Sequence, residues 1–250
     1  MDAAQHVDAA WEAIEDENDG LATTHARRAL TVSRYEIDAY LVLAHTAATP
    51  GERHAFLREA IRLGRKEWAD CFRSPRHTAF WLSLPTRPYM RAAHALAIDL
   101  WNTGLPEERH EAIELAQHLL RLNPNDNQGI RFLLLGWLPT LDQWAPAARI
   151  AKRYARDGRT ETTYWHALHL IRSSDPLAEG VMRKAVDLNP HVPALLTRKR
   201  KPTMTEGDTV AFRSPEEAQA YAHLAHDAWW ATPGAIARVK TVTADSARLR

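Results

Sequence analysis

Two stretches of the chain repeat the same pattern of small and apolar residues and end in the same Asn-Pro pair. They are EAIELAQHLLRLNP (residues 111–124) and LAEGVMRKAVDLNP (residues 177–190). Their closing prolines, Pro124 and Pro190, lie 66 residues apart, which is twice 33. A spacing near 34 residues is typical of helical repeats, which stack because a single repeat cannot bury its apolar face alone. The chain is therefore constrained to an architecture of short, stacked helices.

The repeated stretch resembles the second helix of a tetratricopeptide repeat (TPR), which carries small residues where paired helices touch. Ala112 and Ala178 occupy such a position in the two clear copies. Weaker copies lie at residues 21–34 and 52–64, and a degenerate unit fills residues 142–158. The sequence predicts an all-α fold: a TPR-like right-handed helical-repeat solenoid with C-terminal capping helices.

Helical periodicity extends over most of the chain. Glycine is scarce, with 10 residues, and apolar side chains recur at three- and four-residue spacing, as in RAAHALAIDLW. We expect one continuous domain with four segments. These are degenerate repeats at 1–65, core TPR-like repeats at 66–190, a basic and polar loop at 191–213, and C-terminal helices at 214–250 that pack on the solenoid.

Helix starts are marked by a capping residue followed by proline at the first helical position. Two of these sites also carry a glutamate at the third position. The four predicted starts are Thr49-Pro50-Gly51-Glu52, Ser214-Pro215-Glu216-Glu217, Asp175-Pro176 and Thr232-Pro233. Starts this frequent predict short helices.

The run LNPNDNQGIR (residues 122–131) separates two leucine-rich stretches. Pro124 has no amide hydrogen and disfavours helix in the residue before it, so the preceding helix should end near Asn123. Asn125 or Asp126 can then cap the next helix. The predicted apolar face of that helix consists of Ile130, Leu133, Leu134 and Trp137.

Composition excludes several classes of protein. The chain has 32 Lys and Arg against 31 Asp and Glu, a net charge of +1, so any pull on nucleic acid or anionic membrane would be local. Its most apolar run, FLLLGWL at residues 132–138, is far shorter than the roughly 20 residues that span a bilayer. The single cysteine, Cys71, fits a reducing compartment and reads as a buried thiol. Since no signal peptide is evident, we expect a cytoplasmic protein with no membrane association.

Three longer stretches carry a more specific resemblance. They are FWLSLPTRPYMRAAHALAIDLW (residues 80–101), LNPNDNQGIRFLLLGWL (residues 122–138) and NPHVPALL (residues 189–196). Together they resemble the suppression-of-tumorigenicity family of TPR-like proteins, particularly its short bacterial members, over residues 77–236. The resemblance implies a regulatory or scaffolding role and supplies no catalytic residues. The chain departs from the animal relatives because it lacks membrane segments, and its TRKRKPTMTEGD loop differs from the proline-rich linker of the family.

On a TPR scaffold the first helix of each pair lines the concave surface, where a peptide would bind. Counting from the aligned apolar positions places Arg91, His94, Gln128 and Arg131 on that surface. Two guanidinium groups one repeat apart could hold a peptide carboxylate. The candidate groove residues, with a further cation and two possible apolar floor residues, are Arg87, Arg91, His94, Gln128, Arg131, Trp101 and Trp137. The alternative is that the arginines form internal ion pairs or cover apolar surface, and that both tryptophans are core residues.

Two other functions stay open. A helical-repeat enzyme or small-molecule carrier could use a pocket near His166, His169, His223 and His226, although no nucleophile elbow, phosphate-binding loop or CxxC pair occurs. The basic run at residues 198–201 could bind nucleic acid, or could be a solvated loop. We expect no cofactor and no metal, because the helical stripe of His110, Glu114 and His118 falls on an outward helix face. The partner expected first is an unidentified protein or peptide.

Overall fold

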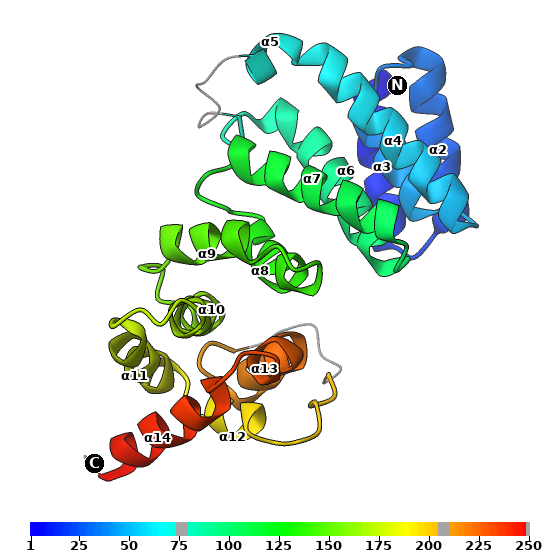
Figure 1. Cartoon of the computed structure of the whole chain (residues 1–250). Helices are drawn as coiled ribbons and strands as arrows, with labels where there is room; N and C mark the ends of the chain where they lie inside the picture. The colour runs from blue at the N-terminus through cyan, green and yellow to red at the C-terminus, as the bar shows by residue number, and fades with distance from the viewer. Residues whose placement is uncertain (74–79, 205–210, 249–250) are drawn as a thin grey trace. The chain divides into compact units, whose positions relative to one another are not determined.

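The computed structural model describes residues 1–73, 80–204 and 211–248 (Figure 1). Within these residues the regular secondary structure is helical and no strand occurs, which confirms the predicted all-α class. The chain forms two compact units, residues 1–130 and residues 131–250. Among the described residues, no helix is both long and apolar enough to cross a lipid bilayer.

The first unit is built from consecutive helices that pack in pairs. Its elements are α1 (Ala3–Glu15), α2 (Asp19–Val32), α3 (Ile37–His45), α4 (Pro50–Glu67), α5 (Ala69–Arg73), the 3-10 turn η2 (Leu84–Thr86), α6 (Arg87–Asn102) and α7 (Pro106–Leu122). The most extensive contacts join α1 with α2, α3 with α4, and α6 with α7. Each pair packs on the next through α2 against α3 and α4 against α6 (Figure 1).

Small residues allow these helices to approach closely. The alanines that the repeat alignment places at helix contacts are all buried: Ala22, Ala29, Ala60, Ala112, Ala178 and Ala185. The core between α1, α2 and α3 is itself rich in alanine, with Val7, Val42 and Leu43 as its larger members. Packing of this kind replaces large interlocking side chains by close backbone approach.

The turn after α7 follows the prediction from Pro124. Helix α7 ends at Leu122 with Asn123 as its C-cap. Asp126 adopts φ of +54°, and its Oδ1 accepts a hydrogen bond from the Ile130 N–H at 2.7 Å, where α8 (Ile130–Thr140) begins. A carboxylate can satisfy an unpaired amide at a helix start in this way.

The predicted apolar face of α8 is partly confirmed. Ile130, Leu134 and Trp137 are buried, whereas Leu133 is only half-buried. Leu135 and Leu138 are fully buried although the prediction did not include them. The buried surface of α8 is therefore wider than one helical stripe.

The second unit continues with short helices. They are α9 (Trp144–Arg153), α10 (Thr160–Arg172), α11 (Ala178–Leu188), α12 (Val192–Leu196), α13 (Pro215–Trp230) and α14 (Ala235–Arg248). Helix α10 packs against α9 and α11, α13 packs against α12, and α14 packs against α11. The predicted loop 191–213 thus contains helix α12 near its start, and its residues 205–210 lie outside the described part of the chain.

Aromatic residues with satisfied polar groups form the centre of the second unit. Tyr164, Tyr221 and Trp229 are each at most 1% exposed. The Tyr164 hydroxyl donates to the Asn189 carbonyl at 3.0 Å, and the Trp229 indole donates to the Tyr221 hydroxyl at 2.8 Å. Buried aromatic residues with satisfied donors add packing area, and their hydrogen bonds offset the cost of removing the polar groups from water.

One expectation about the first unit is wrong. Cys71 in α5 is exposed and not a buried thiol. Its neighbour Phe72 takes the inward position, with ring centroids 5.3 Å from those of Phe80 and Tyr89. Adjacent side chains on a helix are offset by about 100°, so the orientation that turns Phe72 inward leaves Cys71 outside.

Candidate functional site

Arg91, the first predicted groove residue, joins three helices of the first unit. Its Nη2 donates to Oδ1 of Asp38 on α3 at 2.5 Å, and its guanidinium carbon lies 5.6 Å from the ring centre of Trp11 on α1. Burial raises the pKa of Asp38, Arg91 opposes that shift, and Asp8 adds to it. Arg91 therefore forms an internal ion pair while half of its side chain stays exposed.

The other predicted residues of the first unit also make internal contacts. Burial lowers the pKa of His94, against the effect of Asp126. The Gln128 side chain donates to the Met90 carbonyl at 3.3 Å. The guanidinium carbon of Arg87 lies 5.1 Å from the Trp81 ring, and Arg109 covers Trp101 at 4.8 Å.

Arg131 belongs to the second unit and is buried. Its Nε donates to Oδ2 of Asp157 at 3.0 Å, and its guanidinium carbon lies 4.1 Å from the Phe132 ring centre and 5.2 Å from that of Tyr154. The residue is 7% exposed. Trp137 is equally buried. A peptide would gain little direct contact with either side chain.

The histidines of the alternative pocket make two separate sets of contacts. On α10, His169 packs between Trp144 and Trp165, with ring centroids 5.7 and 6.2 Å away, and burial lowers its pKa to about 4. Burial and Lys152 also lower the pKa of His166.

On α13, the histidines contact the backbone of the basic segment. His223 lies 2.8 Å from the Pro202 carbonyl, and His226 lies 2.8 Å from the Arg198 carbonyl. Lys201, in the same segment, pairs with Asp227 at 2.9 Å. Nowhere in the described ranges do three His, Cys, Asp or Glu side chains gather as metal ligands.

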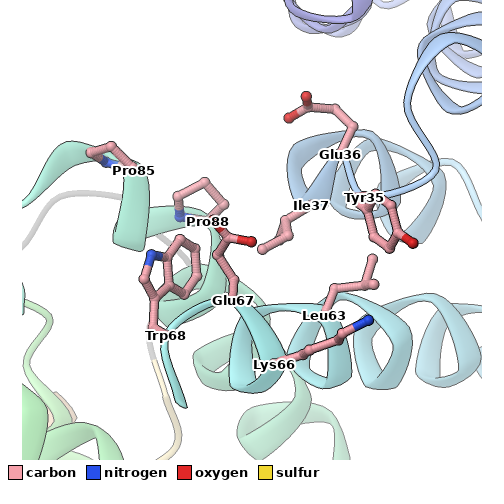
Figure 2. A pocket seen from close by; sticks show the side chains of 9 residues that line it. All are labelled: Tyr35, Glu36, Ile37, Leu63, Lys66, Glu67, Trp68, Pro85 and Pro88. Carbon is pink, nitrogen blue, oxygen red and sulfur yellow. The ribbon is translucent and has the colours of Figure 1, made fainter. Parts of the chain in front are cut away.

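A cavity of about 480 Å³ opens in the first unit where α3 begins, α4 ends and α6 begins (Figure 2). Three segments line it. They contribute Tyr35, Glu36 and Ile37; Leu63, Lys66, Glu67 and Trp68; and Pro85 with Pro88. Apolar and proline side chains make the walls, and three charged groups stand among them.

Trp68 is held by an aromatic cluster behind the cavity. Its ring centroid lies 5.9 Å from that of Phe80 and 6.3 Å from that of Tyr89, both in edge-on geometry. Phe80 and Tyr89 are buried, so they fix the indole in place. Edge-on aromatic pairs at this spacing are stabilising. The cavity wall is therefore ordered before any ligand arrives.

Among the charged groups that line the cavity, Glu36 stands out because its carboxylate lacks a partner among the described residues. It is the N-cap residue of α3, but its side chain makes no capping hydrogen bond. Burial raises its pKa, and Asp38 raises it further. Within the described part of the chain, the Glu36 carboxylate has no hydrogen-bond or ion-pair partner.

Lys66 and Glu67 point in different directions. The Lys66 ammonium lies 5.6 Å from the Tyr35 ring centre, whereas the Glu67 carboxyl group extends toward the open space beside Pro88 (Figure 2). The Tyr35 hydroxyl accepts a 2.6 Å hydrogen bond from Arg34, which lowers its pKa. Lys66 and Tyr35 thus lie at one end of the cavity, and Glu67 and Trp68 lie at the other, near Pro88 (Figure 2). The Glu36 side chain extends above Ile37 in this view.

Sequence reasoning missed this cavity. Counting along helix faces compares positions within one helix at a time, whereas the cavity combines the ends of three different helices. The one sequence signal near the cavity was the TRPYMR motif at residues 86–91. Its Pro88 lines the cavity, and its Arg91 forms the ion pair with Asp38. Tyr35 and Trp68 carry no local signature.

No family model and no curated protein matches this chain.

Proposed function

We propose that this chain is a TPR-like interaction module that binds a peptide segment of a partner protein at the cavity between the ends of α3, α4 and α6. The observation that carries the proposal is the cavity itself. Its volume of about 480 Å³ and its mixed apolar and charged walls suit one or two side chains. An ordered aromatic wall lowers the entropy cost of binding.

Exposed leucines beside the cavity add apolar contact surface. Leu82 is 72% exposed and Leu84 is 66% exposed, and Leu84 immediately precedes the cavity residue Pro85. Neighbouring exposed leucines favour binding of a partner more than isolated ones do. The peptide would contact these residues outside the cavity while one side chain enters it.

The TPR-like part of the proposal rests on helix order and spacing. Helices α1 and α3 begin at Ala3 and Ile37, 34 residues apart, and consecutive helices pack as pairs. Both features are typical of TPR arrays. The resemblance to the suppression-of-tumorigenicity family supports the same scaffolding role.

A peptide that leaves the cavity along α3 and α6 would next meet Arg91, Asp38 and Trp11. Of the predicted groove residues, Arg91 remains in the proposed groove, since half of its side chain is exposed, and its partners Asp38 and Trp11 are added to it. Arg131 does not remain in it, because it is buried and paired with Asp157. We place the module in the cytoplasm, since an exposed lone thiol such as Cys71 suits a reducing compartment.

Selection from a displayed library of random peptides tests the proposal. The purified chain should enrich peptides that bind it with saturable affinity. The double variant Leu82→Ser, Leu84→Ser should weaken their binding at least tenfold. Leu177→Ser is the matched control, because Leu177 is 66% exposed but lies in the second unit. Peptide binding at this site would be refuted if no peptide were enriched, or if the Leu82, Leu84 double variant bound the peptides as tightly as the Leu177→Ser control.

A further inference from the structure

We propose that the cavity takes an arginine side chain of the bound peptide, with its guanidinium group between Glu36 and Glu67 and against the face of Trp68. This inference rests on the proposed peptide-binding function and specifies its chemistry. Both residues line the same cavity, Glu36 from the start of α3 and Glu67 from the end of α4. In Figure 2 the Glu67 carboxyl group lies beside Pro88 and Ile37, and the Glu36 carboxyl group lies across the open space, above Ile37.

The first argument is the unsatisfied carboxylate. Glu36 is half-buried and lacks a hydrogen-bond or ion-pair partner within the described residues. Asp38, the carboxylate that raises the pKa of Glu36, is already engaged by Arg91. A partly buried charge without a partner loses some of its hydration without compensation, and a ligand cation offsets that cost. The free protein therefore has a position where a cation is stabilising.

The second argument is the balance of the other charges. The positive N-terminal end of α3 lies at Glu36, whose full negative charge exceeds the half-charge of a helix end. At the start of α6, Pro88 has no amide hydrogen to offer an anion. The negative C-terminal end of α4 and Glu67 lie on the opposite side. Lys66, the opposing cation, turns toward Tyr35.

The third argument is shape, which favours arginine over lysine. A guanidinium group is planar, stacks on aromatic faces and donates to two carboxylates from one fork. Trp68 supplies an aromatic ring at the cavity wall, while Ile37 and Leu63 supply apolar surface for the methylene stem. An ammonium group would use the carboxylates but not the indole in this way.

The experiment compares two blocked tetrapeptides, acetyl-Ala-Arg-Leu-Ala-amide and the same peptide with citrulline in place of arginine. Citrulline keeps the shape of arginine and removes its charge. Binding is followed by NMR through the Trp68 indole N–H resonance, assigned with Trp68→Phe. The arginine peptide should bind at least tenfold more tightly than the citrulline peptide.

Three variants and one control complete the test. Glu36→Gln and Glu67→Gln should each weaken binding of the arginine peptide at least threefold and reduce its advantage over citrulline. Lys66→Gln should strengthen binding, because it removes a like charge. Glu15→Gln, an exposed glutamate on α1, should change nothing.

Each outcome separates this inference from the broader proposal. Equal binding of the arginine and citrulline peptides, or no binding of either, overturns the arginine assignment. In that case library peptides that still depend on Leu82 and Leu84 would show that peptide binding holds with a neutral side chain in the cavity. Absence of both kinds of binding would overturn the two proposals together.

Discussion

A Cβ atom on Gly64 would lie 2.5 Å from Cδ2 of Tyr89, which is closer than non-bonded carbon atoms approach. Gly64 lies in the last turns of α4, and Tyr89 lies near the start of α6. The missing side chain lets the two helices meet directly beneath the aromatic cluster that holds Trp68. The glycine is therefore a packing requirement of the cavity wall.

Gly64→Ala should destabilise the protein although alanine is the better helix former. The overpacking cost of about 1–3 kcal/mol exceeds the helix-propensity gain of about 1 kcal/mol. Gly180 in α11 provides the control, because an added Cβ there meets nothing within 4 Å. Gly180→Ala should raise the free energy of unfolding by about 0.5 kcal/mol. Urea denaturation of both variants checks the opposite signs, and a stabilising Gly64→Ala would contradict the proposed close packing.

Local sequence signals predicted the helix boundaries that depend on neighbouring residues. Pro124 ended α7 where expected, and the side chains of Thr49 and Ser214 accept hydrogen bonds from Glu52 and Glu217 as predicted caps. In each of these cases the responsible atoms lie within four residues of one another. Such local interactions can therefore be predicted from neighbouring residues without knowledge of the tertiary packing.

Two predicted helix starts are wrong for a similar local reason. Helix α11 begins at Ala178 and α14 at Ala235, each two residues beyond the predicted proline. Asp175 accepts a hydrogen bond from the Leu177 amide in a tight turn, and Gly234 adopts φ of +74°. A capping residue followed by proline also fits a turn, and the sequence pattern does not distinguish the two.

The cavity could not be predicted because its walls come from segments up to 53 positions apart, from Tyr35 to Pro88. Their proximity depends on how α4 packs against α3 and α6. The partner of Arg91 was equally hidden, since Asp38 has the appearance of an ordinary first-turn acid on α3. Helix propensity and periodicity carry no information about such tertiary pairs.

Arg91 and Arg131 should differ sharply in their contributions to stability. Both form an ion pair, but the Arg91 side chain is 51% exposed and that of Arg131 only 9%. Arg91→Ala should cost about 1 kcal/mol or less, as for other exposed pairs. Arg131→Ala should cost about 3–5 kcal/mol, because it leaves the Asp157 carboxylate without its charged partner. Urea denaturation measures both, and similar losses would refute the difference in environment.

Glu217 should be a major stabilising residue of the second unit. Its Oε2 accepts hydrogen bonds from Thr160 Oγ1 at 2.7 Å, Asn189 Nδ2 at 3.0 Å and the Arg213 N–H at 2.9 Å. Glu217→Ala leaves these donors unsatisfied and should cost roughly 3 kcal/mol or more. Glu217→Gln keeps an acceptor oxygen and should lose less.

The adjacent Glu216 serves as the control for Glu217, since it is exposed on the same turn of α13. Glu216→Ala should change the free energy of unfolding by at most about 0.5 kcal/mol. Thermal melting followed by circular dichroism ranks the variants. If the two alanine variants melt together, the buried hydrogen-bond network does not stabilise the unit.

His169 should make the protein less stable as the pH falls. Burial, and then Arg172 and His166, lower its pKa from 6.5 to about 4, and its Nε2 has no hydrogen-bond partner within the described residues. His169 therefore binds a proton near pH 6.5 in the unfolded chain, but only near pH 4 in the folded protein. The contribution of neutral His169 to the free energy of unfolding is fully present above pH 6.5. It is lost as the pH falls from 6.5 to about 4, by an amount on the order of 3 kcal/mol.

His169→Phe removes this titration while keeping an aromatic ring between Trp144 and Trp165. The free energy of unfolding of the variant should therefore fall less than that of the wild type between pH 7 and pH 4.5. All other titrating groups are shared, so the difference between the two curves isolates His169. Parallel curves would show that the imidazole protonates in the folded protein as readily as in the unfolded chain, and its position between the two indoles would then not exclude the charged form.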